Sequence, residues 1–196
     1  SENYKELIEK MYDKYDDSNS EKQRIFNIAT RLMDKIGYEK LSIRQICTEA
    51  GISTGKFYIY FSSKQDLLNH FYDDVQQKIA EESLLKFNGL GLKESIVEFY
   101  RWYADYTSSF GIEFVINYFD PHNSAMDIIM STTDSYLEQA IQSGYKLPAG
   151  KTIHQISQQI CMIFKGIIFT WAASHGNFRL SDMVVDILGA SLIGLL

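Results

Sequence analysis

The chain has 196 residues, 45% of them hydrophobic and 22% charged, which is the composition of a globular protein with one large domain or two small ones. Two distant cysteines, without a Cys-x-x-Cys spacing, exclude a disulfide framework and a zinc signature. The acidic first twenty residues lack the apolar segment of a secretion signal, and the most apolar stretch, 160–173, contains Lys165 and is too short to cross a bilayer. We therefore expect a cytoplasmic protein without a membrane partner.

The net charge of −6 is unevenly distributed. Residues 1–19 hold three lysines and six acidic residues, and residues 71–196 hold eight basic and fourteen acidic residues. Residues 20–70, by contrast, hold eight basic and five acidic residues, a net charge of +3. A positive segment within an acidic chain favours a partner that carries phosphates.

The first predicted element is an amphipathic helix over 4–15, because apolar residues recur there every three or four positions. Asp16 to Ser20 then interrupt the pattern. We expect residues 1–19 to form a helical N-terminal extension, and the residues indicate no function for it.

Three short helices are predicted to follow a longer one. The longer helix runs from about residue 20 and ends at Gly37, a residue suited to a left-handed stop. Ser42 with Gln45 is a capping box that opens a helix to Ala50. Gly51 ends that helix. The remaining caps are expected at Ser53 and at Ser62, the latter paired with Gln65.

The rest of the chain has the pattern of helices separated by short breaks, and it shows no alternation of apolar and polar residues typical of strands. A helix from residue 63 to about 87 is followed by the sequence NGLGL at 88–92. Further helices are expected over 93–109, 111–119, 123–143, 151–175 and 181–195. The sequence therefore predicts an all-α protein.

The segment GISTGKFYIYF at 51–61 combines glycines with closely spaced aromatic residues. In a helix that begins after Ser53, Phe57 and Phe61 point to one side because they are four residues apart. The opposite arc then carries Gly55, Lys56, Tyr58 and Ile59. A glycine on this arc permits close approach of a large partner. The pattern as a whole indicates a helix-turn-helix unit that reads DNA, since it consists of a short helix, a glycine turn and a second helix with inward aromatic residues.

The segment LSIRQICTEAGISTGKFYIYFSSKQDLL at 41–68, with ATRLMDKIGY at 29–38, resembles the signature of the TetR/AcrR family of bacterial transcriptional regulators. The resemblance covers about residues 24–70, and Cys47 departs from the usual alanine. It implies a three-helix helix-turn-helix DNA-binding domain over 20–68 and a helical ligand-binding and dimerisation domain over 69–196.

The resemblance also implies roles for individual residues in contacting double-stranded DNA. Arg44 has the geometry to bond guanine, and Ile59 can only contact a thymine methyl. Other interpretations remain for some residues: Tyr58 and Tyr60 as core aromatics, Lys64 as a solvated lysine, and Ile59 as cover for a neighbour. Phosphate contacts are implied for Ser42, Lys56, Tyr58, Tyr60 and Lys64, and base contacts for Arg44, Thr54, Gly55 and Ile59.

The second domain is rich in aromatic residues and methionines, which could line a cavity for a small apolar or aromatic ligand. Each candidate taken alone fits ordinary core packing, but as a group we expect some to line a pocket. No metal site, cofactor motif or catalytic motif is recognisable, so we expect no cofactor and no enzyme. The pocket candidates are Trp102, Tyr103, Tyr106, Phe114, Tyr118, Met126, Met130, Phe169 and His175.

The last two helices have broad apolar faces that one subunit would struggle to hide. We expect them to form a four-helix bundle in a homodimer, the alternative being that both faces are buried within one subunit. The expected interface residues are Ile160, Phe164, Ile167, Ile168, Trp171, Val184, Ile187, Leu188, Ser191 and Leu192.

Together these features predict a homodimeric repressor that binds a palindromic operator and is released by a small ligand. The helix at 63–87 would transmit the change, since it joins the two domains. An activator or a protein-responsive regulator of the same fold is an alternative, and an enzyme or carrier built on the helical body is a more distant one.

Overall fold

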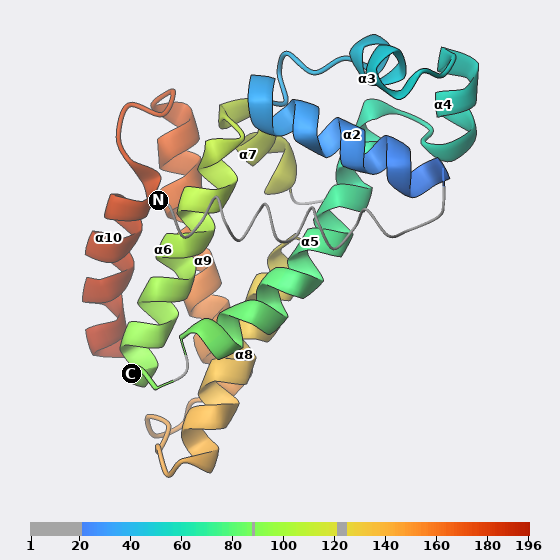
Figure 1. The fold of residues 1–196 in the computed structure, drawn as a ribbon. Helices are drawn as coiled ribbons and strands as arrows, with labels where there is room; N and C mark the ends of the chain where they lie inside the picture. The colour runs from blue at the N-terminus through green and yellow to red at the C-terminus, as the bar shows by residue number, and fades with distance from the viewer. Residues whose placement is uncertain (1–20, 88, 121–124) are drawn as a thin grey trace. The chain divides into compact units, whose positions relative to one another are not determined.

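The computed structural model describes residues 21–87, 89–120 and 125–196, and these residues form helices joined by turns (Figure 1). The all-α prediction is confirmed. The chain divides into two compact units, of which the first ends at Phe71 and the second begins at Tyr72. The extension expected over 1–19, its helix at 4–15 and the helix start expected at 123 lie outside the described residues.

The first unit contains α2 (Glu21–Ile36), α3 (Ile43–Ala50), α4 (Thr54–Tyr60) and the first turns of α5 (Lys64–Lys86). In Figure 1, α3 and α4 are short helices joined by a tight turn, and α3 packs against both α2 and α4. Large apolar side chains fill the space between the helices. This core includes Ile25, Phe26, Met33, Ile46, Phe57 and Phe61, all of them buried.

Local hydrogen bonds fix the ends of α3 and α4 as the sequence predicts. The capping box of α3 is complete, since Gln45 N donates to Ser42 Oγ over 3.2 Å and Ser42 N donates to Gln45 Oε1 over 2.8 Å. Gly51 ends α3 with a φ of 64°. Ser53 caps α4 by accepting from Lys56 N over 3.1 Å.

The prediction for the start of α5 is wrong by one residue. Asp66 N donates to Ser63 Oγ over 2.9 Å, so Ser63 is the capping residue rather than Ser62. Ser62 instead donates its N–H to Asp66 Oδ2 over 2.7 Å. Both serines have a polar residue three positions ahead, so spacing alone does not distinguish them. In the structure the Asp66 carboxylate bonds Ser62, which leaves Ser63 Oγ to accept the Asp66 backbone N–H.

The second unit contains the rest of α5 with α6 (Leu92–Ser109), α7 (Ile112–Tyr118), α8 (Ala125–Gln142), α9 (Ile153–Ala173) and α10 (Leu180–Leu195). Helix α6 packs against α10 and α8, and α9 packs against α8 and α10. The expected helices are present with ends shifted by one or two residues. Helix α9, for example, begins at Ile153 because Thr152 caps it.

One described helix, α9, is long and apolar enough to cross a membrane by length and composition. This is weak support for a membrane span, because buried core helices pass the same test and 44% of its apolar window is buried within the unit. Its Ile156, Ile160 and Phe164 side chains are fully enclosed by neighbouring helices. The packing of α9 is therefore that of a core helix.

Candidate nucleic-acid interface

Helix α4 has one buried side and one exposed side. Phe57 and Phe61 are 0% and 1% exposed, their ring centroids lie 5.7 Å apart, and Phe61 also contacts the His70 ring at 5.8 Å. Tyr58 and Ile59 are 54% and 77% exposed. The aromatic pair thus anchors α4 while its other side faces solvent, which confirms the predicted inward and outward residues.

Gly55 lies on the exposed side of α4. A Cβ atom built at Gly55 would meet only Ser53 Oγ, at 3.8 Å. The fold itself therefore tolerates a side chain at this position. Close approach of a partner to the backbone is one reason for a glycine here that the fold does not supply.

An ion-pair network joins α2 to α4. Lys56 Nζ lies 2.8 Å from Glu21 Oε1, and Arg24 Nε donates to Glu21 Oε2 over 2.9 Å. Arg24 Nη2 also donates to the Ala50 carbonyl oxygen over 2.9 Å, at the end of α3. The hydrogen bonds from Arg24 and Lys56 lower the pKa of Glu21 from 4.5 to about 2, so this carboxylate is charged at neutral pH.

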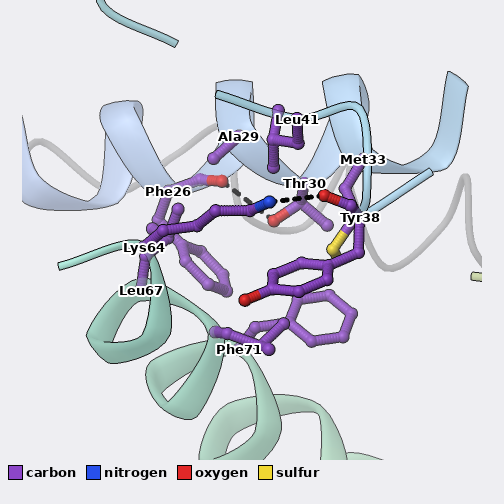
Figure 2. A pocket seen from close by; sticks show the side chains of 10 residues that line it. Phe26, Ala29, Thr30, Met33, Tyr38, Leu41, Lys64, Leu67 and Phe71 are labelled. Carbon is purple, nitrogen blue, oxygen red and sulfur yellow. Dashed lines mark hydrogen bonds between the residues drawn. The ribbon is translucent and has the colours of Figure 1, made fainter. Parts of the chain in front are cut away.

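Lys64, in the first turn of α5, is held by Tyr38. Its Nζ donates to the Tyr38 carbonyl oxygen over 2.6 Å and lies 3.9 Å from the centre of the Tyr38 ring. Figure 2 shows this contact at the edge of a small apolar pocket that Phe26, Met33 and other core residues line. Lys64 is half-buried, so it is not the freely solvated lysine that sequence alone allowed.

The predicted DNA-contacting residues all lie in the first unit, on α3, α4, α5 and the turns before them. Tyr60 is half-buried like Lys64, and the 54% exposure of Tyr58 excludes it from the core. Sequence reasoning missed Glu21, because its pairing with Lys56 spans 35 positions and no local pattern reports it. The exposed members are Ser42, Arg44, Thr54, Gly55, Lys56, Tyr58 and Ile59.

The pocket candidates of the second unit fall into two groups. Trp102, Tyr103, Tyr106, Phe114 and Tyr118 are buried in a cluster of aromatic rings, in which Trp102 stacks on Tyr106 and Phe114 on Tyr118. Polar atoms are enclosed with them, since Tyr118 Oη accepts from Gln76 Nε2 and bonds Tyr103 Oη. Burial raises the pKa of Tyr118.

The other candidates lie away from this cluster. Met126 and Met130 are half-buried on α8. Phe169 is 75% exposed and His175 is exposed in a left-handed turn with a φ of 54°, so neither lines an internal pocket in this structure. Helical periodicity alone could not show that Phe169 lies on the outer side of α9.

A cleft of about 390 Å³ opens elsewhere in the second unit. Its walls come from the end of α5, the start of α6 and the end of α8. Every described residue that lines it is uncharged. The lining residues are Phe87, Gly89, Leu90, Leu92, Ser95, Tyr136, Gln139, Ala140, Ser143 and Tyr145.

The expected dimer residues require a correction. Ile160, Phe164, Ile167, Ile168, Trp171, Val184, Leu188 and Leu192 are buried within one unit, where they pack its own core. Ile187 is 45% exposed and Ser191 is half-buried. Helices α9 and α10 pack against each other, α9 also packs against α8, and α10 also packs against α6. These contacts bury most of the apolar faces of α9 and α10. The large apolar side chains still exposed on α9 and α10 are Met162, Phe169, Val185, Ile187 and Ile193.

The described residues contain no group of three or more histidine, cysteine, aspartate or glutamate side chains able to hold a metal ion. Cys47 and Cys161 are free and buried, and burial raises the pKa of both thiols.

Comparison with known proteins identifies the first unit. Residues 25–71 match the family of bacterial regulatory proteins of the tetR type. Over 50 residues the chain is 44% identical to the uncharacterized HTH-type transcriptional regulator YerO of Bacillus subtilis (strain 168), a match covering 26% of this chain and 17% of that protein. The HTH-type transcriptional regulator HbdR of Aromatoleum sp. (strain CIB) is 35% identical over 65 residues, or 31% of this chain and 28% of HbdR. The chain thus matches less than a third of the length of these relatives.

The fold extends the similarity to nearly the whole chain. FadR of Thermus thermophilus, a TetR-family repressor solved in complex with lauroyl-CoA, superposes with a TM-score of 0.67 at 19% identity, covering 89% of this chain and 95% of FadR. FadR of Bacillus subtilis, solved with stearoyl-CoA, gives a TM-score of 0.64 at 18% identity and coverages of 88% and 98%. At this identity the likeness concerns the fold.

The anchored helix α4 and the turn before it have the arrangement of a helix-turn-helix unit. Residues 25–71 thus carry the sequence pattern of the tetR family of bacterial regulatory proteins, and the all-helical fold of the chain is similar to that of solved regulators of this kind.

Proposed function

We propose that this protein is a homodimeric repressor that binds a palindromic operator and leaves it when an apolar ligand binds the second unit. The observation that carries the proposal is helix α4, whose buried Phe57 and Phe61 fix an exposed surface containing Gly55, Lys56 and Tyr58. A surface of this kind inserts into the major groove in helix-turn-helix proteins. Such a protein acts in the cytoplasm and needs no catalytic activity.

The predicted DNA-contacting residues fall into phosphate-contacting and base-contacting groups. Ser42, Lys56, Tyr58, Tyr60 and Lys64 contact phosphates and position the protein, and contacts of this kind carry no sequence information. Arg44 lies exposed on α3 and Ile59 on α4, where they contact base edges together with Thr54 and Gly55.

The dimer uses the side chains of α9 and α10 that remain exposed. Met162 and Phe169 are seven residues apart on α9, so they share one face of that helix, and Gly166 between them is exposed too. A glycine in that face lets another helix approach closely. A two-fold dimer carries two copies of α4, one for each half of a palindromic site.

The ligand binds the aromatic cluster of the second unit and enters through the cleft. Phe87 lines the cleft and its ring centroid lies 6.4 Å from that of Trp102. Tyr136, on another wall, lies 5.8 Å from Phe99, which in turn lies 5.9 Å from Tyr103. The cleft volume of about 390 Å³ is within the usual range of ligand pockets. The cleft is therefore the open space next to the cluster, and two proteins of the same fold hold acyl-CoA molecules.

Binding would reach the DNA reader through α5, which continues from the first unit into the second without a break. A ligand that binds the two states unequally shifts their populations, and a hundredfold loss of operator affinity corresponds to a coupling of about 2.7 kcal/mol.

The test has two stages. Selection from a random duplex library should enrich a palindromic sequence, and lauroyl-CoA or stearoyl-CoA, but not free CoA, should then weaken its binding. Failure to enrich any sequence would overturn the proposed DNA reader. Enrichment without an acyl-CoA effect would overturn only the ligand class, and tighter operator binding with ligand would contradict release of a repressor.

A further inference from the structure

The ammonium group of Lys56 already has an anionic partner in the protein. Glu21 Oε1 lies 2.8 Å from Lys56 Nζ, an ion-pair distance that a DNA phosphate oxygen would also need. Lys56 belongs to α4, the helix proposed to enter the major groove, whereas Glu21 is the first residue of α2. The Lys56 ammonium group thus has two possible anionic partners, the Glu21 carboxylate of its own chain and the phosphate expected from DNA.

Glu21 is held in place independently of Lys56. Arg24 donates to both of its carboxylate oxygens, over 2.9 Å and 3.1 Å, and the same guanidinium is fixed by the Ala50 carbonyl oxygen. The carboxylate therefore stays beside α4 when Lys56 turns to another partner.

We propose that Glu21 is an internal competitor for the phosphate contact of Lys56 and so weakens the binding of DNA of any sequence. When DNA binds, the Lys56 ammonium group leaves the Glu21 carboxylate and pairs with a phosphate. The Glu21 carboxylate lowers the net positive charge of the DNA-binding surface by one, compared with a protein that lacks it. Most non-specific affinity comes from such charge neutralisation. Glu21 thereby limits the time that the protein spends on DNA outside its operator. This inference rests on the proposed DNA-binding function.

The opposite role for Glu21 makes the opposite prediction. If Glu21 served to orient Lys56 toward a phosphate, its removal would weaken DNA binding. The variant Glu21→Gln distinguishes competition from orientation, because it removes the charge and keeps the shape. The glutamine can still bond Arg24, but it does not form an ion pair with the Lys56 ammonium group.

The experiment measures the affinity of the intact protein for a short duplex of arbitrary sequence across a range of salt concentrations. Glu21→Gln should raise affinity at low salt roughly two- to fivefold, the value of one exposed ion pair. The slope of log affinity against log salt should steepen by about one. The matched control is Glu39→Gln, which removes the same charge from an exposed position of the same unit. It should change the low-salt affinity and the salt slope much less than Glu21→Gln does.

A double-mutant cycle assigns the effect to Lys56. The gain in DNA affinity from Glu21→Gln should disappear in a Lys56→Ala background, because that background has no ammonium group for Glu21 and the phosphate to compete for. A gain that persists, or an unchanged or weaker affinity of Glu21→Gln, would overturn the inference while leaving DNA binding intact. Wild-type protein that binds no DNA at any salt would instead overturn the proposed function. Circular dichroism of each variant confirms that the helices are present.

Discussion

At the scale of single residues, contacts within the first unit decide what its basic side chains can do. Lys56 and Lys64 look equivalent in sequence, as exposed cations near a helix start. In the structure Lys56 pairs with Glu21, and Lys64 is bound to the carbonyl oxygen and ring of Tyr38 (Figure 2). Lys64 therefore has a structural contribution besides the phosphate contact expected of it.

Lys64→Met tests that structural contribution. The variant keeps the apolar stem but loses a charge-assisted hydrogen bond and a cation–π contact, so the free energy of unfolding should fall by about 1 kcal/mol. Tyr38→Phe is the matched control, because it keeps both the carbonyl oxygen and the ring. Urea unfolding measures both variants. Equal stability of Lys64→Met and the wild type would show that the contact with Tyr38 contributes nothing.

At the scale of elements, hydrogen bonds close to each helix start determine where the helix begins. Ser42 and Ser53 cap α3 and α4 as their spacing predicts, since each stands alone before its helix. Before α5 two adjacent serines compete, and Ser63 is the cap because Asp66 lies three residues beyond it. Spacing predicts that this helix exists, whereas its first residue follows from which serine hydroxyl accepts the Asp66 backbone N–H.

The two serines before α5 provide the next prediction. Ser63→Ala should lower the free energy of unfolding by about 1 kcal/mol, the usual value of an N-cap side chain. Ser62→Ala should cost less than half as much, because the Ser62 N–H remains able to donate to Asp66. Chemical denaturation of the two variants gives the ranking. A larger loss for Ser62→Ala would place the cap at the residue that the sequence first suggested.

At the scale of the whole molecule, the proposed dimer depends on the apolar side chains that the second unit leaves exposed. Most of the apolar residues of α9 and α10 pack inside that unit, so an interface has to use the outer side of these helices. Phe169, at 75% exposure, is the largest such side chain on α9. An aromatic ring left in water on a helix with an exposed glycine is suited to contact a second subunit.

Phe169→Glu should weaken dimerisation by about tenfold or more, since the interface would then contain an unpaired charge. Leu85→Glu is the control, because Leu85 on α5 is 77% exposed but lies on neither α9 nor α10. Sedimentation velocity over a concentration series measures both variants. A Phe169→Glu protein that remains as dimeric as the wild type would exclude this face as the interface.

The sequence by itself determined the helices, the caps of α3 and α4 and the helix-turn-helix signature, because these depend on residues within about four positions of one another. It also placed Phe57 and Tyr58 on different sides of one short helix, but left open a core position for Tyr58, which the structure excludes. Tertiary structure alone decided the partner of Lys56, the outward position of Phe169 and the burial of Ile160 and Phe164 in their own subunit. These depend on contacts between residues far apart in the chain, which periodicity within one helix does not encode.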